Sequence, residues 1–121
     1  MKRSTILIAI ASVAFTLGFS SLPAPAQAST TTFNMVASNW KFTPGTITVH
    51  VNQPTTLRFA STMGVHGVYS AELGIANTII QPHKFATVTF TPKKKGTYTV
   101  HCVVYCGPGH AGMTFTVKVV A

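Results

Sequence analysis

From residue 29 onward the sequence is dominated by β-branched residues, which restrict the folds that the chain can adopt. Thr, Val and Ile make up 33 of the 93 residues from Ser29 to Ala121, whereas Leu occurs twice and Glu once. β-branched side chains lose rotamer freedom in a helix and fit the pleated surface of a sheet. A chain of this kind is therefore expected to form an all-β domain.

Alternation of apolar and polar residues indicates the individual strands. It is regular in four segments, residues 47–51, 57–59, 86–90 and 115–119, and it is typical of strands with one buried face. Turns rich in Gly, Pro and Asn separate these segments. Because short strands with one apolar face need a second sheet to cover it, we expect a small antiparallel sandwich or barrel. Residues 62–82 lack the pattern and are expected to be loop with at most one short strand.

The first 28 residues are typical of a secretory signal peptide. Lys2 and Arg3 precede an apolar run over residues 6–19, and Ala26-Gln27-Ala28 supplies the small residues of a cleavage site. Export would place the protein in the periplasm or another extracytoplasmic space.

Cleavage would leave residues 29–121 as the working protein, which is enough for one small domain. The alternative is an uncleaved membrane anchor over residues 4–22. That stretch is barely long enough to span a bilayer, and Ser and Thr dilute its apolar character. We therefore favour release over anchoring.

The charged residues exclude several classes of function. Nine Lys and Arg residues and a single acid, Glu72, give a net charge of +8. A chain with one Glu and no Asp cannot supply a Ser-His-Asp triad or a pair of catalytic carboxylates. It has no Gly-rich phosphate-binding loop, and its basic and aromatic residues do not interleave as on a nucleic-acid-binding surface. We expect no nucleic-acid partner and no enzymatic activity from the domain alone.

One segment contains both cysteines together with a histidine and a methionine. Cys102, Cys106, His110 and Met113 follow the spacing Cys-x3-Cys-x3-His-x2-Met. Thiolate, imidazole and thioether ligands favour copper over hard cations. In an extended strand the two cysteines would lie roughly 13 Å apart, too far to share a metal. Cys102 is therefore expected to end a strand, and Cys106 to lie in a Gly-rich loop that folds back.

The strand before Cys102 predicts the directions of the neighbouring side chains. Tyr98 and Val100 share a face with Cys102, which places Cys102 on the core side. His101 lies on the opposite face and is expected to be an ordinary surface histidine.

A copper site of this composition needs a second imidazole. His66, in the sequence Gly64-Val65-His66-Gly67, is the best candidate because the glycines allow the backbone to approach a site closely. His50 alternates with core valines and should face solvent, and His83 belongs to a turn.

The ligand spacing, with a His-Gly pair 36 residues before the first cysteine, resembles the binuclear copper (CuA) domain of cytochrome c oxidase subunit II. Nitrous oxide reductase carries a similar domain. The resemblance extends from about Phe33 to Val120, and it implies a cupredoxin fold, a Greek-key β-sandwich or barrel.

The resemblance also implies a ligand set and a function. Two copper ions would share a set of six residues: bridging thiolates from Cys102 and Cys106, one imidazole each from His66 and His110, and weak ligation by Met113 and the backbone carbonyl of Val104. Such a centre carries one electron at a time, in a respiratory chain. The expected partners are redox proteins such as a cytochrome c or a terminal oxidase, with membrane contact only through a partner or an uncleaved N-terminus.

The chain departs from oxidase subunit II in two respects. Val104 stands where the family usually has Glu, which preserves the carbonyl ligand but removes any magnesium contact. The family's acidic docking surface for cytochrome c is also missing, because Glu72 is the only acid. Two other docking modes are open: an acidic partner attracted by Lys93–Lys95, for which a solvated hairpin tip is the plainer interpretation, and apolar docking around Pro108 and Ala111. A soluble relative or accessory protein is favoured over a complete oxidase subunit.

Three other hypotheses remain. The first is a mononuclear blue or green site that binds one copper through His66, Cys106, His110 and Met113, with Cys102 uninvolved. The second is a copper chaperone, and the third is a structural Cys102–Cys106 disulfide in an exported sandwich.

Overall fold

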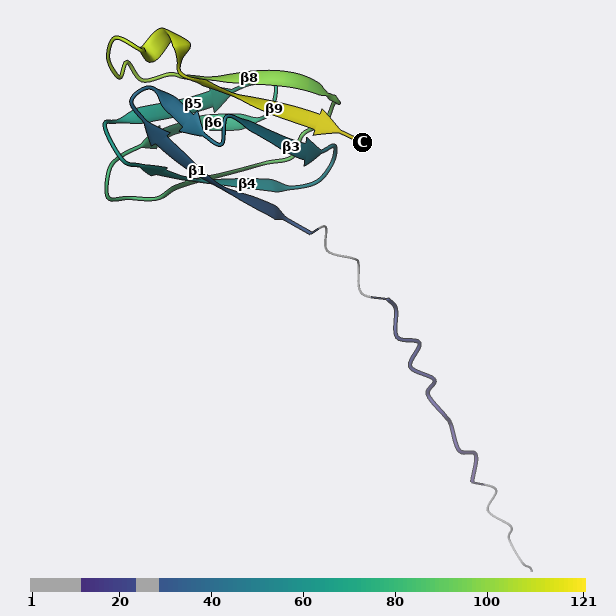
Figure 1. Ribbon diagram of the computed structural model, residues 1–121. Helices are drawn as coiled ribbons and strands as arrows, with labels where there is room; N and C mark the ends of the chain where they lie inside the picture. The colour runs from purple at the N-terminus through teal and green to yellow at the C-terminus, as the bar shows by residue number, and fades with distance from the viewer. Residues whose placement is uncertain (1–11, 24–28) are drawn as a thin grey trace, which may run out of the picture.

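The computed structural model describes residues 12–23 and 29–121 of the chain (Figure 1). In these ranges the chain forms nine strands and one short 3-10 helix. The elements are β1 (Thr31–Ser38), β2 (Lys41–Thr43), β3 (Thr46–His50), β4 (Thr55–Ser61), β5 (His66–Ser70), β6 (Ile75–Ile80), β7 (Ala86–Phe90), β8 (Gly96–Cys102), η1 (His110–Gly112) and β9 (Thr114–Val120).

The strands build two sheets that face one another as a sandwich. One sheet has the order β2-β1-β4-β7 and the other the order β3-β9-β8-β5-β6. The all-β sandwich that the sequence predicts is therefore confirmed, but the expectation of purely antiparallel pairing is wrong. β1 is parallel to β4, and β3 is parallel to β9. Between β1 and β4 the chain crosses to the other sheet to form β3, so β4 returns beside β1 in the same direction.

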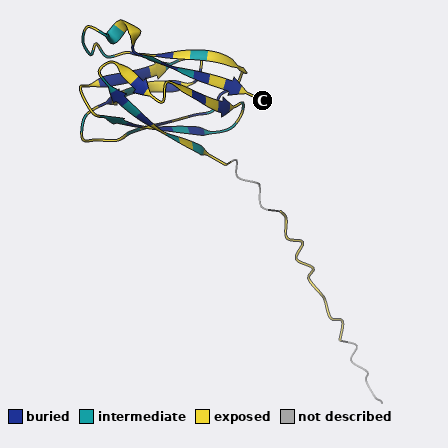
Figure 2. Ribbon diagram, in the orientation of Figure 1, coloured by how far each residue is buried: buried dark blue, intermediate teal, exposed yellow. Residues whose placement is uncertain are grey.

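The side chains between the two sheets form one apolar core. Figure 2 shows the buried residues of both sheets in dark blue. The predicted alternation is confirmed in β3, where Ile47 and Val49 are buried and Thr46, Thr48 and His50 are exposed. At the centre lie the rings of Phe42, Phe59 and Phe115, with centroids 5.2–6.2 Å apart. Edge-to-face packing of this kind adds to the stabilisation from burying aromatic surface.

Residues 62–82 contain two strands, which corrects the expectation of a loop with at most one. β5 begins with three consecutive buried residues, His66, Gly67 and Val68, so its sequence shows no alternation. β6 buries only its first and last residues, Ile75 and Ile80. A register shift between Val68 and Ser70 further disturbs the period of two. Position within the sheet, rather than sequence pattern, makes these segments strands.

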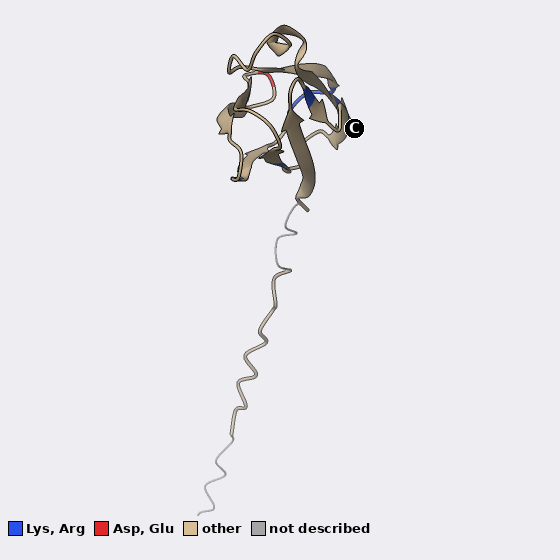
Figure 3. Ribbon diagram, turned by 60° about the vertical axis from the view of Figure 1, so that its left-hand side comes forward, with Lys and Arg blue, Asp and Glu red and all other residues tan. Residues whose placement is uncertain are grey.

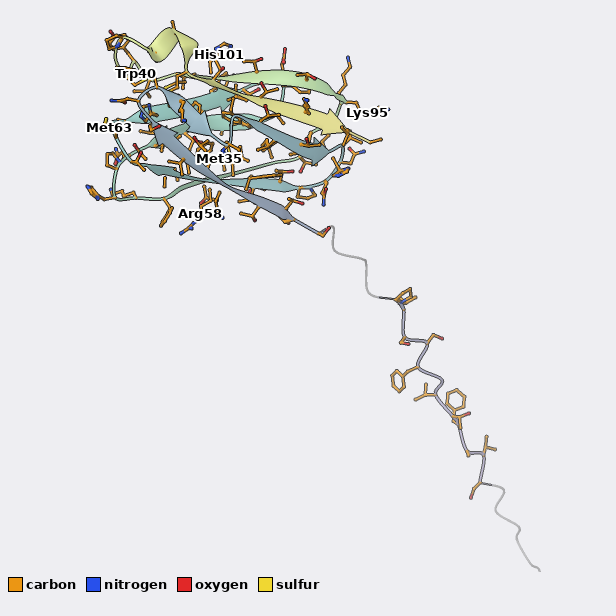
Figure 4. All side chains as sticks on the ribbon, in the orientation of Figure 1. Met35, Trp40, Arg58, Met63, Lys95 and His101 are labelled. Atoms are coloured by element: carbon orange, nitrogen blue, oxygen red, sulfur yellow. The ribbon has the colours of Figure 1, made fainter. Side chains whose placement is uncertain are left out.

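Different segments of the chain lie at the two ends of the sandwich. At the loop end, β8 finishes at Cys102 and leads into the loop of residues 103–113. At the opposite end the chain enters the domain, where Gln53 donates a hydrogen bond to Ser29 O, and leaves it, where Val51 N–H donates to Val120 O. Figure 4 shows Trp40 at the loop end and Lys95 at the far end. β8 has seven residues, so the two ends are separated by about 20 Å.

The residues that predict a signal peptide fall mostly outside this description. Lys2, Arg3 and Ala26-Gln27-Ala28 lie in the ranges 1–11 and 24–28, which are not described. Within the described ranges, the chain has no helix with the length and apolar character needed to span a bilayer.

Candidate metal centre

Cys102 ends β8 on the core side, as its alternation with Val100 predicts. Its side chain is 4% exposed, and its neighbours His101 and Val103 face outward. The backbone around it is fixed, because Cys102 N–H donates a hydrogen bond to Met113 O at 2.9 Å and Val68 lies beside Cys102 on β5.

The loop after β8 folds back and brings the second cysteine to the first. The Cys102 and Cys106 Sγ atoms lie 3.7 Å apart, and the Cys102 thiol also contacts the backbone carbonyl of Val104 at 3.2 Å. Both cysteines are free thiols in this structure. Their sulfur separation is well beyond the roughly 2.05 Å of a disulfide bond, so the fold holds them as two separate donors.

His66 is completely buried at the start of β5 and faces the sulfur of Cys102. Its Nδ1 lies 4.0 Å from Cys102 Sγ, and its Nε2 lies 2.7 Å from Met63 O. Because a carbonyl only accepts hydrogen bonds, Nε2 must donate, which leaves the lone pair of Nδ1 directed at the sulfur side. A backbone carbonyl that fixes the tautomer in this way is the usual support for a metal-binding histidine.

His110 and Met113 lie beside Cys106. His110 Nδ1 is 3.6 Å from Cys106 Sγ, and the Met113 sulfur is 3.7 Å from the same atom. The loop holds this geometry through backbone hydrogen bonds, with His110 N–H donating to Gly107 O and Met113 N–H donating to His110 O. All six residues of the expected ligand set therefore lie together.

Trp40 covers the loop, and sequence reasoning missed this contact. The indole Nε1–H donates a hydrogen bond to Cys106 O at 2.9 Å. The indole ring lies so close to Gly107 and Gly109 that an added Cβ would approach it to 2.9 Å and 2.5 Å, respectively. Gly107 also has φ +124°, a conformation that favours glycine. The glycines in the loop were a signal that something packs against it, but they do not identify Trp40.

The other three histidines lie away from this cluster, as the sequence predicts. His50 and His101 are exposed on the outer face of the five-stranded sheet, and His50 contacts Ala121 O. His83 is an exposed turn residue with φ +64°. His66 is therefore the only histidine outside the loop whose imidazole reaches the sulfurs.

The donors fit copper. The ligand atoms of His66, Cys102 and Cys106 lie within 4.8 Å of one another, and Met113 adds a thioether. Two thiolates, imidazole and thioether form a soft donor set of the kind that copper prefers, whereas magnesium and calcium require oxygen ligands. The only side-chain carboxylate of the chain, on Glu72 (red in Figure 3), lies in the turn between β5 and β6 at the far end of the sandwich.

Burial beside a second thiol makes Cys106 a weaker acid. Desolvation, the hydrogen bond with Cys102 and the charge of the Cys102 thiolate all act to raise the pKa of Cys106. Together they take it from 9.0 to about 11. A thiolate is the form that binds metal. Metal uptake at neutral pH must therefore displace thiol protons.

This raised pKa predicts how the stability of copper-free, reduced protein depends on pH. Below about pH 9 the Cys106 thiol is protonated in both the folded and the unfolded protein, so its full contribution to stability is present. Between about pH 9 and 11 the unfolded state ionises first, and the free energy of unfolding should fall. Urea titrations across this range should show a smaller decline for Cys106→Ser. An identical decline in both proteins would contradict this assignment.

Comparison with known proteins identifies the family. The cupredoxin-like domain family matches residues 7–114. The chain belongs to the cupredoxin-like domain family. In a cupredoxin-like domain, the cluster of His66, Cys102, Cys106 and Met113 is a copper site for electron transfer.

Individual relatives support this membership and the resemblance to oxidase subunit II. Cytochrome c oxidase subunit 2 of Thermus thermophilus is 30% identical over 88 residues, which are 73% of this cupredoxin and 64% of the relative. This chain thus spans less than two thirds of that relative's length.

Two solved structures share the fold of this cupredoxin. The periplasmic domain of cytochrome oxidase subunit II from Bradyrhizobium japonicum has a TM-score of 0.67 at 17% identity, covering 74% of this chain and 83% of that one. Auracyanin A, a blue copper protein from Chloroflexus aurantiacus, has a TM-score of 0.61 at 20% identity, covering 76% and 100%.

Proposed function

We propose that this cupredoxin is an exported one-electron carrier with a binuclear, CuA-type copper centre. One observation carries the proposal: the two Sγ atoms lie 3.7 Å apart, and each has an imidazole Nδ1 beside it. His66 lies on the side of Cys102 and His110 on the side of Cys106. A single blue-type copper would use both imidazoles but only one of the sulfurs, whereas two metals that share both sulfurs use every member of both pairs.

The weaker donors follow the same two-sided pattern. The carbonyl of Val104 lies 3.2 Å from Cys102 Sγ, and the Met113 sulfur lies 3.7 Å from Cys106 Sγ. We assign Cys102 and Cys106 as bridging ligands, His66 and His110 as one imidazole for each ion, and Met113 and the Val104 carbonyl as weak ligands. Val104 would act only through its backbone carbonyl. It can therefore fill this role although oxidase subunit II usually has Glu at this position.

The protein residues keep the ligands in place when the oxidation state changes. Copper supplies the one-electron couple. The His66 imidazole is held by Met63 O, the Cys106 carbonyl by Trp40, and Cys102 by its place in β8. The burial of Met113 and His66 excludes water from the sulfurs. A ligand set held by such outer contacts needs little rearrangement, and its burial disfavours the ready metal release expected of a chaperone.

Copper content and the electron paramagnetic resonance spectrum test the proposal. After reduction of the thiols and reconstitution, we expect two copper ions per chain and hyperfine splitting from two nuclei that share one unpaired electron. Repeated reduction and oxidation should release no copper. One copper per chain with splitting from one nucleus would overturn the binuclear assignment, and loss of copper on cycling would favour a chaperone.

A mononuclear site is the second candidate, and a specific feature favours it. Cys106 Sγ contacts both His110 and Met113 within a single loop, which is enough for three of the four ligands of a blue copper site. His66 would complete the set, although its Nδ1 faces Cys102 Sγ at 4.0 Å. The variant Cys102→Ser separates the two sites.

Export through residues 1–28 is part of the proposal. The basic start, the apolar run and Ala26-Gln27-Ala28 support cleavage after Ala28. N-terminal sequencing of protein recovered from the periplasm of a bacterial host should therefore begin at Ser29. Membrane-bound protein with an intact N-terminus would instead support the anchor.

The partners we propose are redox proteins of a respiratory chain, such as a cytochrome c or a terminal oxidase. The similarity to oxidase subunit 2 supports association with an oxidase. One docking hypothesis is revised by the structure: Lys93–Lys95 precede β8 at the end of the sandwich opposite the loop. They lie about 20 Å from the metal centre along β8, so we propose that a partner that docks over the centre makes its main contacts elsewhere.

A further inference from the structure

A basic pocket lies beside the turn between β4 and β5, whose Met63 carbonyl orients the His66 imidazole. Ala60, Ser61, His83, Lys84 and Phe85 line a cavity of about 260 Å³ at the loop end of the four-stranded sheet. A water molecule occupies about 30 Å³ in the liquid, so the cavity has room for a carboxylate side chain.

An arginine and an aromatic side chain extend this surface. The guanidinium of Arg58 lies over the ring of Phe85, 3.4 Å from the centroid, and Phe85 is 63% exposed rather than packed in the core. Figure 4 shows Arg58 on the outer face of the sandwich. Stacked Arg and exposed aromatic residues are enriched at protein interfaces. Arg58 and Lys84 make this surface cationic, and neither β4 nor β7, the two strands beside it, carries an acidic residue.

A short path connects this pocket to the metal centre. Ser61 Oγ–H donates to Gly64 O at 2.6 Å, and His66 Nε2–H donates to Met63 O at 2.7 Å. Between these two hydrogen bonds lie only the five covalent bonds from the Gly64 carbonyl oxygen to the Met63 carbonyl oxygen. The pocket wall is therefore the same segment that orients a ligand imidazole.

We infer that Arg58, Lys84 and Phe85 dock an acidic segment of the redox partner, with a carboxylate in this pocket. The inference rests on the proposed electron-transfer function. Arg and Lys pair with carboxylates through charge-assisted hydrogen bonds, and opposite charge raises association rates. This site replaces Lys93–Lys95 as the surface for an acidic partner, because it lies at the loop end.

A charged oxidant tests the surface on the reduced, copper-loaded protein. Hexacyanoferrate(III) serves as the anionic probe, and stopped-flow absorbance gives the rate constant at low ionic strength. The variant Arg58→Gln/Lys84→Gln should react roughly 3- to 10-fold more slowly than wild type, and added salt should reduce the difference. The matched control Lys93→Gln/Lys94→Gln removes the same charge at the far end and should change the rate less than about twofold. Equal slowing of both variants, or slowing of neither, would overturn the inference.

A binding measurement separates this inference from the proposed function. Redox-inert hexacyanocobaltate(III) should shift the amide resonances of Ser61 and Phe85 in the reduced protein and leave those of Lys94 unchanged. A short aspartate peptide should compete for the same site, and a serine peptide should not. Shifts centred on Lys94, or none at Ser61, would contradict the site. Failure to retain copper would contradict the proposed function alone, because binding of the inert anion does not depend on electron transfer.

Discussion

Replacing Cys102 with serine is expected to reduce the copper content from two ions per chain to one or none. The reason is the position of the Cys102 sulfur, 3.7 Å from Cys106 Sγ and 4.0 Å from His66 Nδ1. A bridging thiolate serves both metals, and a hydroxyl is a poor substitute among soft ligands. The hyperfine splitting from two nuclei should disappear with it. Metal analysis and electron paramagnetic resonance of the reconstituted variant check both outcomes.

The mononuclear hypothesis predicts no change from wild type for this variant, in either copper content or spectrum. If His66, Cys106, His110 and Met113 hold a single ion, then Cys102→Ser should keep one copper and an unchanged spectrum. The matched variant Cys106→Ser should lose copper binding under either hypothesis, because Cys106 contacts both His110 and Met113. Thermal unfolding followed by circular dichroism would establish that both variants keep the fold.

Alanine at position 109 is expected to displace Trp40 and destabilise the loop. An added Cβ would lie 2.5 Å from Cγ of the indole, closer than any ordinary contact. Gly109 has φ −90°, which alanine tolerates, so the effect is steric overpacking and should cost about 1–3 kcal/mol. Displacement would also remove the hydrogen bond from Trp40 to Cys106 O.

The neighbouring glycine provides the control for this prediction. An added Cβ on Gly112 would meet no atom within 4 Å, so Gly112→Ala should leave stability and copper binding nearly unchanged. Trp40 is the only tryptophan of the chain, so its fluorescence reports displacement directly. A red-shifted emission is expected for Gly109→Ala alone. Equal behaviour of the two variants would show that Trp40 does not hold the loop.

Local patterns in the sequence predict much of this structure. Alternation around Ile47 and Val49 gave the correct strand and the correct buried face, because one face of a half-buried strand must be apolar. The same rule placed Cys102 inward and His101 outward. The choice of His66 among the histidines outside the loop relied on the glycines around it and on the ligand that the motif lacked.

Contacts between distant segments could not be predicted in this way. The hydrogen bond from Trp40 to Cys106 joins residues 66 positions apart, and no periodicity encodes it. The parallel pairing of β1 with β4 depends on the crossover through β3, which is a property of the topology. Phe85 is exposed under Arg58 rather than packed in the core, and no local pattern in the sequence predicts this contact.

The polypeptide enters and leaves the sandwich at the same end, beside Gln53 and Val51, and the sulfur-containing loop occupies the other end. A linker, a lipid tether or a fused domain could therefore be attached at Ser29 or beyond Val120. None of them would cover the loop of residues 103–113. Immobilised through either attachment, the domain should present the same face to every molecule that exchanges electrons with it.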